Sequence, residues 1–361
     1  GEAVWNMLRY NKAESLTILA SADGLSPALS DKIIIADNDS QIEIPEKQPD
    51  GGLVSALANT KNEAIPVFSF IITDKANTDG LPTKIETLVI KNAQPQNNAK
   101  WSVQIGGIKL TVDNREITIH DIQISDNEIE IETDSLFVEN GQSKKCTVWF
   151  YLHNENITDG AQYQFMIDAD DHDWKTGENS SLLAENFDFD IVSNVFITNV
   201  SAVEFAFKAI PVFVEKEKEF QLSLAVTDEN GNIDKDIEQT IKLSLAGGDG
   251  QLSSQSGLSA ILKNGQYSFT DLSYSGNEPF QLKIENGSGD ISLVRPEIWV
   301  TDNINEYLVE NFETGDISTW IQTDDWKISQ YKPVNGSKSL KHNLSGVDGQ
   351  SQIWYEINEN E

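Results

Sequence analysis

Short apolar runs with a period of two residues recur along most of this chain. The clearest places large apolar side chains at Phe220, Leu222, Leu224 and Val226. Successive side chains of a β-strand point to opposite faces of the sheet, so this pattern predicts a strand with one face in a core. Glycine, asparagine and aspartate interrupt the runs at short intervals, as turns between strands do. The sequence therefore predicts an all-β fold of tandem β-sandwich domains.

Residues 66–198 form the largest block of this kind, and we expect one β-sandwich there. A stretch with helical periodicity is hard to find in it, and Ser181–Asn186 would form one turn at most. The expected strands of the block are Val67–Ile72, Lys84–Ile90, Trp101–Ile105, Ile108–Val112, Ile117–Ile124, Ile129–Ile131, Cys146–Leu152, Tyr163–Ile167 and Phe187–Ile197.

One stretch of the chain is present twice. Gly265–Asn303 matches Gly1–Asn38 at an offset of 264 residues at its start and 265 at its end, so one residue of slippage lies between. Such a repeat indicates a modular architecture. The later copy is the back half of a module that starts near Asn199, and we expect the chain to begin within a module of the same kind. The matched pairs are Leu8 and Leu272, Tyr10 and Tyr274, Glu14 and Glu278, Trp5 and Phe269, Leu16 and Phe280, and Ile18 and Leu282.

These patterns divide the chain into five parts. Residues 39–65 are polar and contain two prolines and the Gly51-Gly52 pair, so we expect a linker that adds an edge strand at Gln41–Ile44. About a hundred residues with seven or so short strands, as at 199–303, are typical of an immunoglobulin-like sandwich. We assign residues 1–38 to the C-terminal half of an immunoglobulin-like domain, 39–65 to the linker, 66–198 to a β-sandwich domain, 199–303 to an immunoglobulin-like domain and 304–361 to the start of a further domain.

Two local features of 199–303 carry specific expectations. Asp228-Glu-Asn-Gly231 predicts a hairpin turn, because glycine supplies the positive φ that such a turn requires. Tyr274 precedes a late strand and would either hydrogen-bond back to the main chain as a corner residue or pack as an ordinary core residue.

The charge of the chain excludes some partners. Asp and Glu number 58 against 26 Lys and Arg, which gives a formal net charge of −32. Nucleic-acid binding needs clustered basic residues, so we expect no nucleic-acid partner. No apolar run approaches the roughly 20 residues of a membrane helix, and we expect no membrane insertion.

No motif for a familiar enzyme class is present, and we expect the chain to be non-catalytic. G-x-S-x-G, the phosphate loop, H-E-x-x-H and Cys-x-x-Cys are all absent. The four histidines are scattered, and so many acidic residues supply glycosidase-like carboxylate pairs by chance. Cys146, the one cysteine, lies in an expected strand, where it would act as a small core hydrophobe.

An acidic loop is the strongest candidate for a metal site. Asp168, Asp170, Asp171 and Asp173 place four carboxylates within six residues directly after an expected strand. Oxygen ligands from one loop suit Ca²⁺, although the spacing does not follow the EF-hand pattern. A solvated acidic loop without an ion is the alternative. Asp228-x-Asn230-Gly-Asn232-x-Asp234-x-Asp236 also carries oxygen side chains at every second position, but a hairpin turn explains this pattern alone.

Aromatic residues concentrate near the C-terminus. Trp320, Trp326 and Trp354 could form a platform on which the sugar rings of a surface glycan stack. The alternative is that all three lie in one hydrophobic core.

Three stretches resemble known families. Residues 199–303 resemble the bacterial immunoglobulin-like domains of surface and secreted proteins. Phe68–Asp74 with Asp79–Thr83, Trp101 and Ile105-Gly-Gly is similar to a β-rich module of large secreted proteins of Bacteroidota, which are commonly exported by the type IX secretion system.

The third stretch resembles the opening of a jelly-roll domain of the choice-of-anchor or carbohydrate-binding-like kind. Its residues are Asn311-Phe-Glu-x-Gly315, Trp320, Trp326 and Gly336–Leu340. The resemblance implies that 304–361 is a partial jelly roll. It also implies that Glu313 stands where such domains often hold a structural calcium.

Together these features predict a structural or adhesive segment of a large exported bacterial surface protein. Its modules would act as a stalk or present a partner at the cell surface. Their partners would be other domains of the same long chain, surface glycans, or other surface or secretion proteins. Two alternatives remain: an accessory region of a secreted hydrolase, and a glycan-binding module centred on the C-terminal tryptophans.

Overall fold

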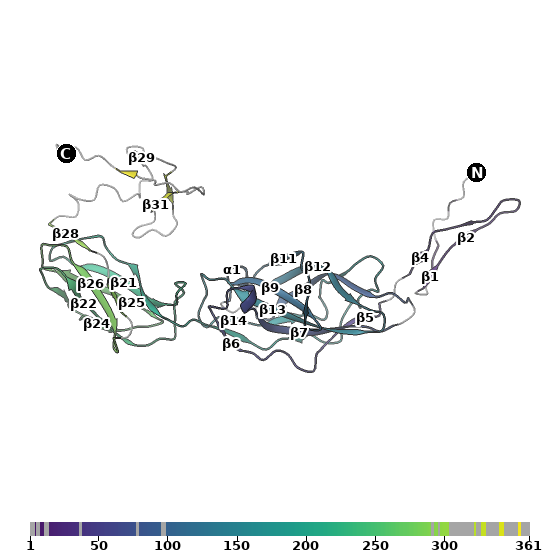
Figure 1. Ribbon diagram of the computed structural model, residues 1–361, viewed down its shortest axis with the longest axis horizontal. Coiled ribbons are helices and arrows are strands. Elements are labelled where there is room, and N and C mark those ends of the chain that lie inside the picture. The colour runs from purple at the N-terminus through teal and green to yellow at the C-terminus, as the bar shows by residue number, and fades with distance from the viewer. Residues whose placement is uncertain are drawn as a thin grey trace. The chain divides into compact units, whose positions relative to one another are not determined.

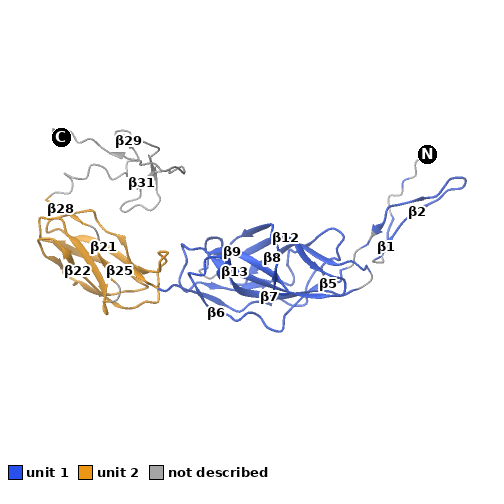
Figure 2. Cartoon of the chain, in the orientation of Figure 1, with its two compact units in different colours: residues 1–201 blue, residues 202–361 orange. Residues whose placement is uncertain are grey.

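The computed structural model confirms the all-β class (Figure 1). It describes residues 4, 8–10, 14–35, 38–76, 79–94, 99–289, 292–294 and 297–302, together with the strand residues 321–322, 326–329, 339–342 and 353–354. The chain divides into two compact units, residues 1–201 and 202–361 (Figure 2). We describe each unit by itself.

Unit 1 holds a β-sandwich with two main sheets and a smaller third one. The five-stranded sheet has the order β10 (Arg115–Glu116), β9 (Ile105–Val112), β13 (Ser143–Leu152), β7 (Ile65–Asp74) and β5 (Ser40–Glu43). The six-stranded sheet has the order β11 (Asp121–Ile124), β12 (Glu128–Val138), β8 (Thr83–Asn92), β15 (Phe165–Ile167) and β17 (Ile191–Val192), with β16 (Lys175–Thr176) also on β8. The three-stranded sheet has the order β14 (Gln162–Tyr163), β18 (Phe196–Asn199) and β6 (Gly52–Ser55).

Strand β13 shows why the period of two builds this core. Cys146, Val148, Phe150 and Leu152 are all fully buried, while the residues between them are half-buried on the opposite face. Phe150 packs against Tyr163, with ring centroids 5.4 Å apart. Cys146 is therefore core filler, as expected, and burial raises the pKa of its thiol.

The expected strand Trp101–Ile105 is wrong, because residues 101–104 form a single helical turn, α1 (Trp101–Gln104). The carbonyl of Lys100 accepts hydrogen bonds from the N–H groups of Val103 (3.1 Å) and Gln104 (2.9 Å). Trp101 and Gln104 are three residues apart, so the turn directs both into the core. Trp101 packs on Phe165, and Gln104 Oε1 accepts a 2.6 Å hydrogen bond from the Tyr163 hydroxyl. Val103, which a strand would have buried beside Trp101, is exposed.

Two other expected strands differ from the structure of unit 1. Phe187–Ile197 is extended strand only at β17 and at the start of β18. The expected strand Ile117–Ile124 is regular only in its second half, because residues 117–120 cross from one main sheet to the other. The N–H of Ile117 donates to Leu110 of β9, and that of His120 donates to Glu132 of β12.

Residues 39–65 are part of the sandwich instead of a linker. The expected edge strand is present as β5, which pairs with β7. Val54 of β6 lies in the core, and a 3₁₀ turn, η1 (Lys61–Glu63), leads into β7. The Gln48 side chain also pairs with the main chain of Ser69: its Nε2 donates to the carbonyl (2.7 Å) and its Oε1 accepts from the N–H (2.9 Å). The Gln48 amide thus satisfies the main-chain N–H and carbonyl of Ser69, as a neighbouring strand would at that edge.

Unit 2 contains an immunoglobulin-like β-sandwich. One sheet has the order β19 (Glu204–Ala209), β21 (Phe220–Thr227), β25 (Gln266–Tyr274) and β23 (Leu252–Ser254). The other has the order β24 (Ser259–Ile261), β22 (Thr240–Gly247), β26 (Gln281–Asn286) and β27 (Ser292–Val294). The alternating residues Leu222, Leu224, Leu243 and Leu282 from the two sheets meet in one core, as their period predicts. Strands β20 (Phe213–Glu215) and β28 (Trp299–Thr301) form a separate two-stranded sheet.

The turn at Asp228–Gly231 forms and closes a short antiparallel bridge between Thr227 and Ile233, where the N–H of Asp228 donates to the carbonyl of Asn232 at 3.0 Å. Asp228 Oδ1 accepts hydrogen bonds from the N–H groups of Asn230 (3.0 Å) and Asn232 (2.9 Å), and Gly231 has a φ of +81°. The strands on either side, β21 and β22, belong to different sheets. The turn therefore begins a crossover from one sheet to the other.

Tyr274 is a corner residue. Its hydroxyl accepts a 2.9 Å hydrogen bond from the N–H of Gly250 and donates to Asp249 Oδ1 at 3.2 Å. The same carboxylate oxygen accepts the N–H groups of Asn277 and Glu278, which hold the loop before β26. Hydrogen bonds from Glu278, Asn277 and Tyr274 lower the pKa of Asp249.

Short strand pairs form at both ends of the chain. Residues 14–35 carry β1 (Ser15–Leu16) paired with β4 (Ile33–Ile34), and β2 (Leu19–Ala20) paired with β3 (Ala28–Leu29). Near the C-terminus, β29 (Ile321–Gln322) pairs with β32 (Ile353–Trp354), and β30 (Trp326–Ser329) pairs with β31 (Ser339–His342). These four strands fall where the sequence predicts a partial jelly roll, which stays a prediction.

The α1 turn yields a matched test of the core. We expect Trp101→Ala to lower the free energy of unfolding of unit 1 by about 3–5 kcal/mol, because the indole is fully buried against Phe165. Val103→Ala in the same turn should change it by less than about 0.5 kcal/mol, because Val103 is exposed. Chemical denaturation of both variants checks this. Equal effects would contradict the helical turn.

Candidate functional site

The predicted acidic loop follows β15, and three of its carboxylates, those of Asp168, Asp171 and Asp173, contact other groups of the protein. Asp168 Oδ1 accepts the N–H groups of Asp170 (3.0 Å) and Asp171 (3.2 Å), so it caps its own loop. Asp171 Oδ2 lies 2.7 Å from Lys91 Nζ, and Asp173 Oδ2 lies 3.7 Å from the same atom. Lys91 comes from β8 and is mostly buried, so the sandwich supplies a fixed cation beside the loop.

His172, within the same loop, is held in one tautomer. Its Nδ1 accepts the N–H of Trp174 at 3.1 Å, so the ring proton is on Nε2, which lies 3.1 Å from the Ala184 carbonyl. The ring stacks on Phe187 with centroids 4.2 Å apart. Trp174 Nε1 in turn donates to the Val89 carbonyl of β8. These contacts make His172 a structural residue that anchors the loop.

The other predicted site residues belong to unit 2. Glu313 and Trp320 lie outside the described residues. Trp326 begins β30, where it is paired with His342, and Trp354 ends β32, where it is paired with Ile321. The two tryptophans thus lie in different strand pairs. The glycan platform and the Glu313 calcium stay predictions.

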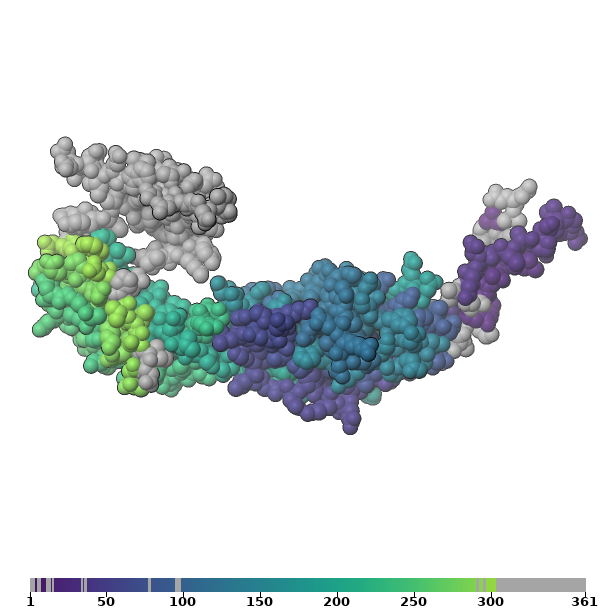
Figure 3. Space-filling view, in the orientation of Figure 1, coloured from purple at the N-terminus to yellow at the C-terminus, as the bar shows by residue number. Residues whose placement is uncertain are grey.

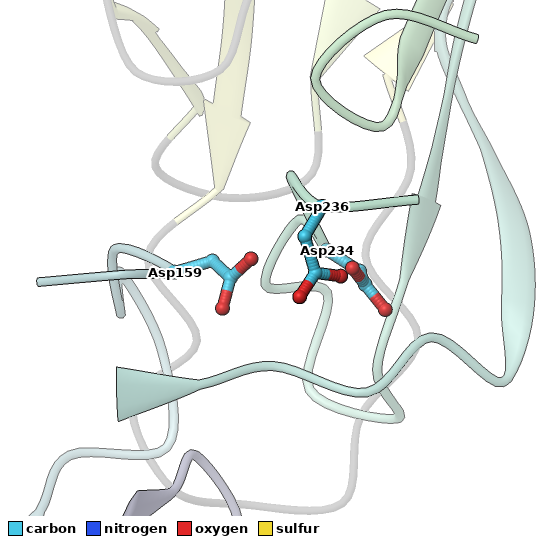
Figure 4. Close-up of side chains that lie close together, drawn as sticks. All are labelled: Asp159, Asp234 and Asp236. Carbon is cyan, nitrogen blue, oxygen red and sulfur yellow. The ribbon is translucent and has the colours of Figure 1, made fainter. Parts of the chain in front are cut away.

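Buried aspartates fix the ends of the peptide at residues 200–202, each within its own unit. In unit 1, Asp159 Oδ1 accepts the N–H of Val200 at 2.9 Å. In unit 2, Asp234 Oδ2 accepts the N–H of Ala202 at 2.8 Å. Figure 4 draws both side chains, with that of Asp236. Only Ser201 separates the two anchored residues, so each sandwich controls the direction of its own end of the connection.

Unit 1 carries a surface groove of about 610 Å³ that sequence reasoning missed. Its apolar part comes from isoleucines of β9, β11 and the 117–120 crossover, and its charged part includes the Lys61–Glu116 ion pair. Tyr151 lies against Gly107, where an added Cβ would meet the phenol oxygen at 2.3 Å. The groove is lined by Lys61, Ile108, Lys109, Glu116, Ile117, Thr118, Ile119, His120, Asp121, Ile122 and Tyr151.

The groove combines apolar and charged side chains, a lining that suits a small ligand or a peptide side chain. His120 Nε2 lies 3.0 Å from Asp134 Oδ1, and both side chains are exposed. No nucleophile contacts that histidine among the described residues. The one signal in the sequence was the Gly106-Gly107 pair, which leaves room for the Tyr151 ring.

Comparisons with known proteins identify no family. No protein-family model matches the sequence. No curated protein matches it either. None of the helices in the described part of the chain is long and apolar enough to cross a membrane.

Solved structures give only distant likenesses. Domains 4 and 5 of the S-layer protein SbsC are 13% identical with a TM-score of 0.24, over 54% of this chain and 99% of that one. The adhesin InvE of Yersinia pseudotuberculosis is 9% identical with a TM-score of 0.21, over 71% and 57%. β-Glucuronidase 3 of Bacteroides uniformis is 10% identical with a TM-score of 0.23, over 56% and 23%. TM-scores this low support no inference about function.

The Lys91–Asp171 ion pair sets a pH dependence. The hydrogen bond that Asp171 accepts from Lys91 lowers the pKa of Asp171. The stability that this ionised carboxylate contributes is therefore present above about pH 3.9 and is lost as the pH falls through its folded-state pKa. Burial alone would lower the pKa of Lys91, but the hydrogen bond and charge of Asp171 raise it overall. The lysine contribution is therefore lost only as the pH rises past about 10.4.

We expect Asp171→Asn to lower the melting temperature of unit 1 by roughly 1–3 °C at pH 7 and to have no effect near pH 2. Asp170→Asn, which removes the same charge from the same loop, is the control and should leave the melting temperature unchanged. Differential scanning calorimetry across this pH range makes the comparison. An effect of Asp171→Asn that persists at pH 2 would show that the ion pair is not its cause.

Calcium at the acidic loop has its own test. If the loop holds Ca²⁺, EDTA should lower the melting temperature of unit 1 by several degrees, because an ion that binds only the folded state stabilises it. Asp168→Asn should abolish this difference. Melting curves that overlap with and without EDTA would mean that the loop is solvated and ion-free.

Proposed function

We propose that this chain is a non-catalytic structural or adhesive segment of a large exported bacterial surface protein, where its β-sandwich modules act as a stalk or present a partner outside the cell. The observation that carries the proposal is a parallel strand pair that joins an early strand to the last strand in each sandwich. Parallel neighbours are unusual among the otherwise antiparallel strands of this chain.

In unit 1 the pair is β6 and β18, with Gly52 opposite Phe196 and Ser55 opposite Asn199. Hydrogen bonds from the N–H of Gly52 to Val195 (3.0 Å) and from that of Ala56 to Asn199 (2.9 Å) extend the ladder at both ends. The Thr198 hydroxyl ties β18 to the carbonyl of Thr158 at 2.7 Å. The last strand of the sandwich is thus bound both to the early strand and to the loop before β14.

In unit 2 the pair is β20 and β28, with Phe213 opposite Trp299 and Glu215 opposite Thr301. Here the N–H of Lys216 donates to Thr301 at 3.0 Å and that of Trp299 donates to Val212 at 2.9 Å. The same device is therefore built into both units from unrelated local sequences.

Parallel pairing of this kind resists extension. The chain enters the early strand at one end of the ladder and leaves the last strand at the other end. A pull on the two ends of a unit then acts along the strands and stretches all the ladder bonds together. A hairpin of antiparallel strands would instead open one bond at a time. A stalk needs this resistance and a catalytic domain does not, which is why the geometry favours a mechanical role.

Single-molecule stretching of the full chain tests the proposal. Residues 52–199 and 213–301 are closed off by the two ladders, so their release adds about 50 nm and about 30 nm of chain and identifies each event. We expect Ala56→Pro to lower the force of the longer event, because proline removes the N–H that donates to Asn199.

Leu53→Pro is the matched control. Gly52 and Ala56 donate toward β18. Because the N–H direction alternates along a strand, that of Leu53 points away from the ladder. Leu53 is also exposed. Its substitution should change the force of the longer event much less, and neither variant should change the shorter one. A force that is equal for both variants would contradict the mechanical role of the β6–β18 ladder.

A further inference from the structure

Residues 14–35 repeat the strand pairing of the back half of unit 2 residue for residue. Leu19 pairs with Leu29, and the matching pair in unit 2 is Lys283 with Val294. Leu16 pairs with Ile33, and the match is the bridge of Phe280 with Ile298. In both cases the first partner is offset by 264 residues and the second by 265. The slipped residue therefore lies in the loop between β2 and β3, and the pairing register is conserved on both sides of it.

The apolar face of this hairpin is exposed where that of unit 2 is buried. Ile18 is 40% exposed and its counterpart Leu282 is fully buried. Leu8 is 65% exposed against 0% for Leu272. Tyr10, which hydrogen-bonds to Glu14, is 48% exposed, whereas Tyr274 is buried at the corner of the sandwich. Figure 3 shows the surface of the hairpin in purple near the N-terminus.

Unit 2 shows what covers a face of this shape. Phe280 packs against Phe220, and Leu282 and Ile284 of β26 lie opposite Leu245 and Leu243 of β22. Phe220 and β22 belong to the front half of the module, residues 202–264, whereas Tyr274 of β25, which stacks on Phe280, belongs to the back half. Among the described residues, β2 pairs only with β3, so its other edge has the position that β22 occupies in unit 2. Neither hydrophobic core contains a described residue of 14–35.

We infer that the hairpin at 14–35 is a docking surface for the front half of an immunoglobulin-like module with the strand pattern of residues 202–264. The partner supplies a β22-like strand to the open edge of β2. It also supplies a row of large apolar residues like Leu222, Leu224 and Leu243 to the face that includes Leu16 and Ile18. This inference is independent of the proposed function, because it rests on register and burial alone.

The test adds such a front half to the full chain. In unit 2, Asn264 is followed directly by Gly265, which matches Gly1. A second copy of residues 202–264 fused ahead of Gly1 therefore reproduces the connection that unit 2 contains. We expect hydrogen exchange of the amides in β1 to β4 to slow by about a hundredfold or more, because they join a cooperative core. The exchange of unit 2 should stay unchanged.

Two substitutions keep the test decisive. Leu222→Asp in the added copy alone should abolish the new protection, because it places a charge in the core that would form. Ile18→Asp should leave the melting temperature of the unfused chain unchanged and remove the protection of the fused one.

Three results would overturn the inference. One is slow exchange of the amides of β1 to β4 already in the unfused chain, which would mean that another part of that chain covers the hairpin. Another is protection that rises with the concentration of the unfused chain, which would identify a second copy as the partner. The third is unchanged exchange after fusion.

Discussion

A β-sheet that is apolar on one face must bury that face against another layer, and this constraint determines most of the chain. Phe150 and Leu152 of β13 lie in the core of unit 1, and Leu222 and Leu282 meet in unit 2. Each fully buried side chain of this size stabilises its unit by about 1.5–3 kcal/mol. The hairpin at 14–35 has the same strand register, and its described residues belong to neither core. Its exposed apolar face is the basis of our inference that a further layer covers it.

The two sandwiches share one arrangement, a parallel pair that includes the last strand of each. Unit 1 closes its ladder with β6 and β18, and unit 2 closes its ladder with β20 and β28. Buried aspartates then fix the peptide on each side of Ser201: Asp159 binds the main chain of Val200 and Asp234 binds that of Ala202. Both units thus hold the main chain of their terminal segments by hydrogen bonds, to the partner strand in each ladder and to an aspartate side chain next to Ser201.

The sequence predicts the strands well where one face is buried and the other is not. β13 and β21 follow from their alternation, and the corner role of Tyr274 was one of two readings that its position allowed. The α1 turn could not be found that way, because Trp101 and Gln104 face the core with a spacing of three. The sequence predicts a linker at residues 39–65 because the contacts that hold this segment in the sandwich are not local. The hydrogen bonds of Gln48 to Ser69, for example, join residues 21 positions apart.

The candidate site was predicted less well, because its residues come together only in the tertiary fold. The acidic residues at 168–173 are visible in the sequence, but Lys91, which neutralises part of their charge, lies 80 residues away from Asp171. The groove beside Tyr151 combines four separate segments, and the Gly106-Gly107 pair next to one of them does not by itself indicate a binding surface. Short motifs reveal turns and strands, whereas sites of this kind arise from the tertiary fold.

Native-state hydrogen exchange of the full chain tests the central claim most directly. The amides of Gly52 and Ala56 in unit 1, and of Trp299 and Lys216 in unit 2, close the two parallel ladders. If these ladders hold the sandwiches together, each amide should exchange only through global unfolding of its unit, with the same opening free energy as Val148 or Leu224 in the cores. Exchange through local opening, with a free energy well below that of the core amides, would contradict it.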